Sequence, residues 1–257
     1  MGKRLWKREE FILVLNLYLK TPFGKMHSRN MDVMHLAELI GRTPNSVALR
    51  LANFASCDPI LQSRGIKGMT GGQKQCQPYW NKFISNREKL LFESESILAN
   101  YENTTIEKKY HKELIEIPKS IVGEEKVREV ETRVNQNVFR SVVLANYNVK
   151  CALTGIDMSE LLVASHIIPW ADKEETRLNP ENGICLSSLY DKAFDQGLIT
   201  FNDDYMTIFS HRLKENVGKE YYSKYFKPID GQQLIKPEKY YPNKEFLEYH
   251  RDVIFNH

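Results

Sequence analysis

The segment that decides the fold is spread over three stretches: LLVASHIIPW at residues 161–170, LNPENGICL at 178–186 and YDKAFDQG at 190–197. Residues 161–168 predict an apolar strand, which Pro169 ends because proline has no N–H to donate to a sheet. Asn182-Gly183 is a turn signal that leads into a second short strand over residues 184–186. The local order is therefore strand, long loop, strand and then a short helix in the third stretch.

Two aspartates lie four residues apart on that helix, between a serine cap at Ser187 or Ser188 and a stop at Gly197. Asp191 and Asp195 therefore project from one helical face, where two like charges disfavour a bare helix. A divalent cation between them would reverse this effect, and carboxylate oxygens favour hard ions, Mg²⁺ or Mn²⁺. A solvated acidic face is the alternative.

The single histidine of the first strand, His166, lies among apolar residues. An unperturbed imidazole titrates near about 6.5, so it is mostly neutral and able to accept a proton at cellular pH. A hydrogen-bonded core histidine is the alternative to a catalytic base.

Taken together, these stretches resemble the HNH nuclease family, whose fold is the ββα-metal finger, and within it a subgroup of restriction endonucleases. The resemblance covers residues 130–257. It extends to positions on both sides of the finger, namely Gln136, Phe139, Arg140, Tyr147, Cys151, Thr154, Gly155, a hairpin at 198–201 and a terminal helix at 245–251.

By this resemblance, His166 corresponds to the general base that deprotonates the attacking water, and Asn182 to the asparagine that holds the loop and orients that histidine. Asp191 and Asp195 correspond to the metal positions on the helix. Ser165 stands where many members carry an Asp or His ligand, and Asp191 stands where the last histidine of the motif is usual. Because a serine hydroxyl is a poor ligand, water or phosphate must complete the shell of Mg²⁺ or Mn²⁺.

The amino-terminal part predicts helices over residues 5–20 and 31–40, and a third that begins at Thr43-Pro44. Gly41 lies at the turn between the second and third helices. This pattern is typical of a helix-turn-helix, and a plain three-helix bundle is the alternative. The stretch GRTPNSV at residues 41–47 also resembles the domain that precedes HNH units in some restriction enzymes.

Basic and polar side chains in both parts are candidates for DNA contacts. Those at the start of the second helix of the pair are Arg42, Asn45, Ser46 and Arg50, and those within or beside the ββα unit are Arg140, Arg177 and Lys192. Ordinary surface solvation is the alternative for the last three.

The chain has 257 residues, of which 42% are hydrophobic and 27% charged. This composition is globular and excludes collagen-like, mucin-like and wholly disordered classes. Residues 1–100 hold 15 Lys and Arg against 8 Asp and Glu, and the remainder holds 21 against 25. A basic amino-terminal part suits a polyanion-binding module.

We therefore expect an α+β protein with a helical DNA-recognition domain at residues 1–100, a linker at 101–123 and an HNH nuclease domain at 124–257. Residues 58–76 read as a loop, and residues 80–115 as a polar helical connector. Four widely spaced cysteines predict free thiols rather than a zinc knuckle or disulfides. No apolar run approaches the ~18 residues of a bilayer span and no secretory segment is evident, so we expect a cytoplasmic protein without a membrane partner.

The expected activity is metal-dependent hydrolysis of phosphodiester bonds in double-stranded DNA, as a restriction enzyme in bacterial defence. Because one HNH site cuts one strand, this role implies a homodimer or two sequential nicks. The alternatives are a non-catalytic DNA-binding regulator with a degenerate HNH finger, and a mobile-element nuclease.

Overall fold

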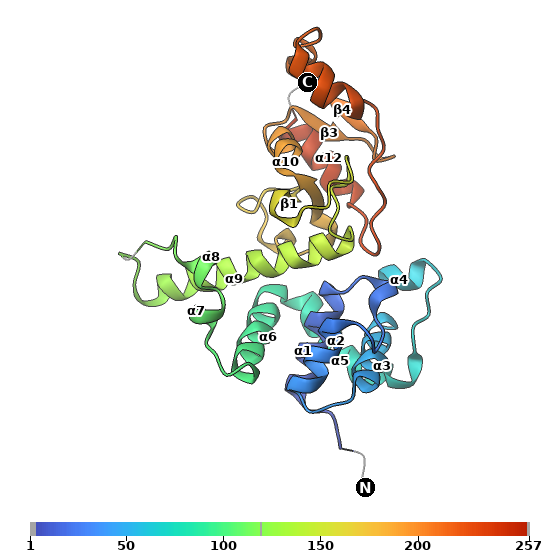
Figure 1. The fold of residues 1–257 in the computed structure, drawn as a ribbon, viewed down its shortest axis with the longest axis vertical. Helices are drawn as coiled ribbons and strands as arrows, with labels where there is room; N and C mark the ends of the chain where they lie inside the picture. The colour runs from blue at the N-terminus through green and yellow to red at the C-terminus, as the bar shows by residue number, and fades with distance from the viewer. Residues whose placement is uncertain (1–3, 119, 256–257) are drawn as a thin grey trace. The chain divides into compact units, whose positions relative to one another are not determined.

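The computed structural model describes residues 4–118 and 120–255, and the chain divides into two compact units, Met1–Ser141 and Val142–His257. In Figure 1 the first unit runs from blue to green and the second from light green to red. None of the helices in these two ranges is long and apolar enough to cross a bilayer.

The described part of the first unit consists of helices joined by turns. The α-helices are α1 (Arg8–Lys20), α2 (Met31–Leu39), α3 (Pro44–Ala55), α4 (Pro59–Ser63), α5 (Gln73–Ser85), α6 (Arg87–Tyr101), α7 (Ile106–Lys109), α8 (His111–Leu114) and most of α9 (Gly123–Asn146), with 3₁₀ turns at Phe23–Lys25 and Thr70–Gly72.

The predicted pair of helices around Gly41 is present as α2 and α3. Asn30 caps α2 by accepting hydrogen bonds from the N–H groups of Asp32 and Val33, and Thr43 caps α3 by accepting one from Ser46. Gly41 turns the chain between them with a φ of 63°, which a residue without Cβ adopts at little cost. This local geometry agrees with the predicted helices, whereas the role of the pair in DNA binding stays a prediction.

Residues 101–123, predicted to be a linker, fold against the first unit. Ile106 of α7 and Tyr110 pack with Ala99 of α6 and Val134 of α9 in a buried cluster. The division between the two compact units falls after Ser141, within α9, instead of in this segment. Helix α9 continues through this division, and none of its 24 residues is a proline that would interrupt it.

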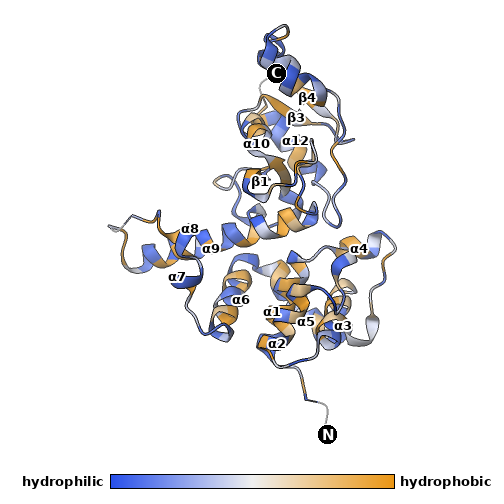
Figure 2. Ribbon diagram, in the orientation of Figure 1, coloured by the Kyte–Doolittle hydropathy of each residue, from blue (hydrophilic) through white to orange (hydrophobic). Residues whose placement is uncertain are grey.

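Helix α9 changes character along its length. Figure 2 shows a mostly hydrophilic first half and a more hydrophobic end. The final turns carry Val138, Val142 and Val143, which are buried. Apolar periodicity does not predict this helix, because the first half is mostly polar. The helix is stabilised by the packing of its apolar end against the rest of the protein.

The second unit is built around two small antiparallel sheets. Its strands are β1 (Leu162–His166), β2 (Gly183–Ser187), β3 (Ile199–Phe201) and β4 (Thr207–Phe209), and its helices are α10 (Ser188–Asp195), α11 (His211–Lys214) and α12 (Lys244–Val253), with a π-helix at Tyr222–Phe226 and 3₁₀ turns at Ser159–Leu161, Glu174–Thr176, Pro180–Asn182 and Lys227–Ile229.

Strands β1 and β2 pair with His166 opposite Gly183, and α10 follows β2 directly. Gly197 ends the helical region with a φ of 63°. The predicted order of strand, loop, strand and helix is therefore present. All four cysteines are free and buried, as the spacing predicts.

Candidate functional site

A cavity of about 460 Å³ in the second unit collects polar side chains from three elements. Strand β1 contributes Ser165 and His166, helix α10 contributes Asp191 and Asp195, and helix α12 contributes His250. These elements lie together in the upper part of Figure 1. The cavity therefore combines an imidazole with two carboxylates that are separated from it in sequence.

Asn182 fixes the backbone that follows His166. Its side-chain oxygen accepts a hydrogen bond from the Ile168 N–H at 2.8 Å, and its Nδ2 donates to the carbonyls of Ile168 at 3.0 Å and Thr176 at 3.2 Å. The side chain is fully buried and is not among those that line the cavity. Asn182 is therefore a positioning residue that ties the end of β1 to the loop before β2.

His166 is oriented by the same loop. Its Nε2 lies 3.0 Å from the carbonyl oxygen of Arg177. Because a carbonyl can only accept, Nε2 carries the hydrogen, and Nδ1 of the neutral ring bears the lone pair. Burial lowers the pKa of His166, although the hydrogen bond to Arg177 opposes this shift. The imidazole is thus neutral near pH 7 and chemically able to accept a proton.

The two carboxylates of α10 are held in their protonated forms more readily than usual. Burial raises the pKa of Asp195 to about 6, and the neighbouring charge of Asp191 adds to the shift. Burial also raises the pKa of Asp191, while nearby Ser165 and Lys192 lower it. A cation between these carboxylates would relieve the cost of their ionisation.

The donor set suits a hard divalent ion with an incomplete protein shell. Ser165 is buried, and its hydroxyl makes no hydrogen bond of regular geometry with the described residues, although it lies close enough to Asp191 to lower that group's pKa. Within residues 4–118 and 120–255, no three His, Cys, Asp or Glu side chains form a closed metal site. Mg²⁺ is commonly held by one or two carboxylates, with water and substrate phosphate as the other ligands. The residues present fit that arrangement.

His250 is a site residue that the sequence reasoning missed. It is 1% exposed, and its ring stacks on Phe194 at 3.7 Å. Its Nε2 donates to the carbonyl of Phe194 at 3.1 Å, so Nδ1 accepts from the Thr200 hydroxyl at 2.9 Å. Burial lowers the pKa of His250 to about 4. This neutral histidine satisfies a carbonyl at the end of α10 and so positions the helix that bears both aspartates.

The basic residues predicted near the site occupy different surroundings. The Arg177 guanidinium lies 5.3 Å from the Trp170 ring, and its Nε donates to the Trp170 carbonyl at 2.8 Å. Lys192 is exposed on α10, and its positive charge lowers the pKa of both Asp191 and Asp195, against the larger effect of burial. Arg140 lies on α9 in the first unit, outside the set of side chains that lines the cavity.

The predicted DNA-contacting residues of the first unit differ in exposure. Arg42 forms an ion pair with fully buried Glu10 at 2.7 Å. Arg50 is 8% exposed, and its guanidinium lies 4.7 Å from the Trp6 ring. Asn45 is exposed and Ser46 is partly exposed at the start of α3. The two arginines are thus engaged inside the unit, and the two polar residues reach its surface.

Residues 151–202 match the family model for HNH endonucleases. This segment contains β1, β2, α10 and β3, and therefore all the cavity residues described above except His250. Among curated proteins, none matches the chain. The match supports the resemblance to HNH nucleases over this segment.

Proposed function

We propose that the protein is a divalent-metal-dependent DNA endonuclease. The observation that supports this most directly is the shared cavity, in which His166 faces the same space as Asp191 and Asp195. A proton acceptor and a pair of hard oxygen ligands are the groups that hydrolysis of a phosphodiester requires. The match of residues 151–202 to HNH endonucleases supports the same chemistry.

In the proposed reaction, His166 takes the proton from a water molecule that attacks phosphorus. Nε2–H donates to the Arg177 carbonyl, and Nδ1 of the neutral ring carries the lone pair that would take that proton. The low pKa of the imidazole keeps it neutral before the transfer. Asn182 keeps the loop that carries Arg177 at a fixed distance from the end of β1.

Asp191 and Asp195, with the Ser165 hydroxyl, would hold Mg²⁺ or Mn²⁺. When bound, such an ion supplies positive charge that stabilises the scissile phosphate and the departing 3′-oxygen. Lys192, which is exposed on the same helix, would contact a neighbouring backbone phosphate. Arg177 and Arg140 are further candidates for such contacts.

We further propose that the first unit recognises double-stranded DNA and that the enzyme restricts foreign DNA as a homodimer. Asn45 and Ser46 would contact DNA at the start of α3, and Arg42 and Arg50 would contribute by fixing that helix. A two-fold symmetric dimer cuts both strands and pairs with a symmetric target. Cleavage of methylated and unmethylated phage DNA, followed by mapping of the ends, tests the restriction role.

The nuclease activity is tested by incubating supercoiled plasmid with the full chain in Mg²⁺, in Mn²⁺ or in EDTA. We expect cleavage with either metal and none with EDTA. His166→Ala should abolish cleavage while DNA binding persists, whereas His211→Ala, which changes an exposed histidine of the same unit, should cleave normally. Full cleavage by His166→Ala would refute the assignment of His166 as the general base. DNA binding without cleavage by the unaltered chain under every condition would favour the alternative of a non-catalytic DNA-binding regulator.

A further inference from the structure

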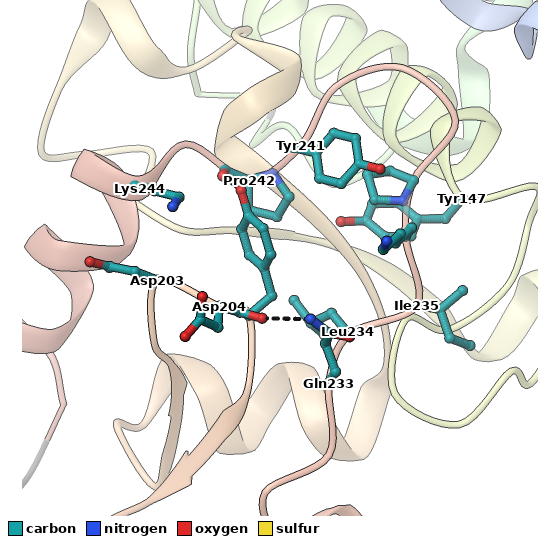
Figure 3. A pocket seen from close by; sticks show the side chains of 12 residues that line it. Tyr147, Asp203, Asp204, Gln233, Leu234, Ile235, Tyr241, Pro242 and Lys244 are labelled. Carbon is teal, nitrogen blue, oxygen red and sulfur yellow. Dashed lines mark hydrogen bonds between the residues drawn. The ribbon is translucent and has the colours of Figure 1, made fainter. Parts of the chain in front are cut away.

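A second cavity in the second unit, of about 280 Å³, lies apart from the residues discussed so far. Its walls come from Tyr147 directly after α9, the β3–β4 turn, the segments 233–237 and 241–242, and Lys244 at the start of α12. Figure 3 shows Tyr147 and Tyr241 gathered at one end and Asp203, Asp204 and Lys244 at the other. The cavity thus has an aromatic end and a charged end.

The hydroxyl of Tyr147 lacks a hydrogen-bond partner among the described residues. The residue is 4% exposed, and its ring is one of the walls of the cavity. Burial raises the pKa of Tyr147 most, followed by the nearby Cys185 thiol of β2 and then by the Tyr205 and Tyr241 hydroxyls, which belong to the same walls as Tyr147. A buried hydroxyl without a partner is costly, so its retention calls for a ligand that completes it.

Two further aromatic rings form a platform beside this hydroxyl. The rings of Tyr205 and Tyr241 lie 6.0 Å apart at an angle of 43°. Tyr205 has a φ of 61°, which is unusual for a bulky residue. Its hydroxyl donates to the Pro242 carbonyl at 3.2 Å, and its own carbonyl accepts from Leu234 at 3.0 Å (Figure 3). The backbone therefore holds the ring in place.

The rim of the cavity carries two lysines and two aspartates. Lys236 and Lys244 are exposed, and neither forms an ion pair within the described ranges. Asp203 is paired with Arg251 at 2.8 Å, and Asp204 is exposed. Arg251, which lies outside the lining, neutralises Asp203. The two lysines then face one further carboxylate, that of Asp204, and this local surplus suits a ligand that carries one phosphate.

We propose that this cavity binds one unstacked nucleobase with its phosphate. The tyrosine rings would pack against the base, the Tyr147 hydroxyl would hydrogen-bond to its edge, and the lysines would hold the phosphate. Aromatic rings beside basic residues are the combination with which proteins bind the bases and backbone of single-stranded nucleic acids. The base comes either from a free nucleotide or from DNA, and the second source rests on the proposed nuclease function.

The position of the cavity fits a base close to the site of cleavage. Helix α12 begins at Lys244, which lines this cavity, and carries His250, which lines the first one. Six residues of α-helix rise about 9 Å. Successive phosphates of one strand are about 3.4 Å apart along the axis of duplex DNA, so one strand covers a distance of this order within a few nucleotides.

Two binding measurements on the full chain test the proposal and separate the two sources. The first is calorimetric titration with the four deoxynucleoside 5′-monophosphates and with the corresponding nucleosides. The second uses the His166→Ala chain, which leaves DNA intact, and follows the fluorescence of a single 2-aminopurine placed at an unpaired position of a duplex. Tyr147→Phe, Lys244→Gln and the exposed-surface control Lys227→Gln are compared in each.

We expect binding in at least one of the two measurements. Binding in the titration identifies a free nucleotide as a ligand, and a change in 2-aminopurine fluorescence identifies a base of DNA. Tyr147→Phe should weaken the binding about tenfold, as for the loss of one hydrogen bond. Lys244→Gln should remove the preference for a nucleotide over its nucleoside, and Lys227→Gln should change neither. Tyr147→Phe should also leave the ligand-free chain at least as stable as before, because it removes an unpaired hydroxyl.

The proposal is overturned if both measurements show no binding, if Tyr147→Phe binds as the unaltered chain does, or if that substitution destabilises the ligand-free chain. Plasmid cleavage by the chain without substitutions is scored separately. Cleavage without nucleotide binding refutes the cavity alone, and nucleotide binding without cleavage refutes the nuclease function alone.

Discussion

The Asp195→Asn substitution distinguishes two effects of the Asp195 carboxylate: its destabilisation of the metal-free chain when it is ionised, and its contribution to metal binding. Asp195 has its pKa raised from 3.8 to about 6, first by burial and then by Asp191. A folded-state pKa above the unfolded one means that the chain without metal loses stability as the pH rises from about 4 through about 6. Asparagine does not titrate, so the variant escapes that loss.

The size of the effect follows from the shift and from solvent exposure. A rise of the Asp195 pKa from 3.8 to about 6 corresponds to about 3 kcal/mol, since a pKa change of one is worth about 1.36 kcal/mol. Because Asp195 is an exposed residue by total side-chain and backbone area, solvent screening reduces the expected effect to about 1 kcal/mol. In EDTA at about pH 8, Asp195→Asn should therefore unfold about 2–4 °C above the unaltered chain, and the difference should vanish near pH 4.

Addition of Mg²⁺ or Mn²⁺ should reverse the order of stability. An ion at about 100 times its Kd adds about 2.7 kcal/mol to a folded chain that binds it, and the variant lacks one of the two carboxylates. Thermal unfolding across the pH range, with and without metal, measures both effects, with exposed Asp157→Asn as the control. Equal metal-induced shifts in Asp195→Asn and the unaltered chain would refute the ligand assignment. A variant less stable than the unaltered chain in EDTA at pH 8 would refute the electrostatic argument.

Three other substitutions or conditions test the remaining parts of the structure. Because burial lowers the pKa of His166, the acid limb of the cleavage rate against pH should have its midpoint below about 6.5; a midpoint above that value in single-turnover assays would contradict the assigned environment. Asn182→Ala should cost about 2–4 kcal/mol in urea unfolding, since it removes three buried hydrogen bonds, and a loss below about 0.5 kcal/mol would show that the clamp is dispensable. Arg42→Ala should destabilise the chain by about 1–3 kcal/mol, because buried Glu10 then keeps Arg4 but loses the hydrogen bonds from Arg42, and adding Glu10→Gln should recover part of the loss; a change in DNA affinity at unaltered stability would assign Arg42 to DNA instead.

The ββα unit could be predicted because its signals are local. Pro169 follows the first strand, and the i, i+4 spacing of two aspartates requires only a helix. The turn predicted at Asn182-Gly183 lies slightly earlier, as a 3₁₀ turn over Pro180–Asn182, and Gly183 is already the first, extended residue of β2. Each signal lies within a few residues of the backbone feature that it determines. Their common cavity then follows from one β-hairpin and the helix attached to it.

Residues that act across longer separations could not be found in this way. His250 lies 84 positions after His166, and nothing in its own helix indicates that its ring stacks on Phe194. The arginines of the first unit were expected at a DNA surface from their place beside a turn. A sequence pattern does not distinguish an exposed arginine from one such as Arg42, whose partner Glu10 lies on another helix.

Hydrogen-bond satisfaction separates the residues that position the site from those that would bind a ligand. Asn182 and His250 are buried, and the polar atoms of their side chains are hydrogen-bonded to other parts of the unit. By contrast, Ser165 has a buried hydroxyl without a regular partner, and the pKa of Asp195 is raised. A fold retains such unfavourable groups when another molecule completes them. The hydroxyl of Tyr147 meets the same criterion in the second cavity. Within the described part of this unit, the two cavities are therefore where the buried side-chain hydroxyls without a regular hydrogen-bond partner lie.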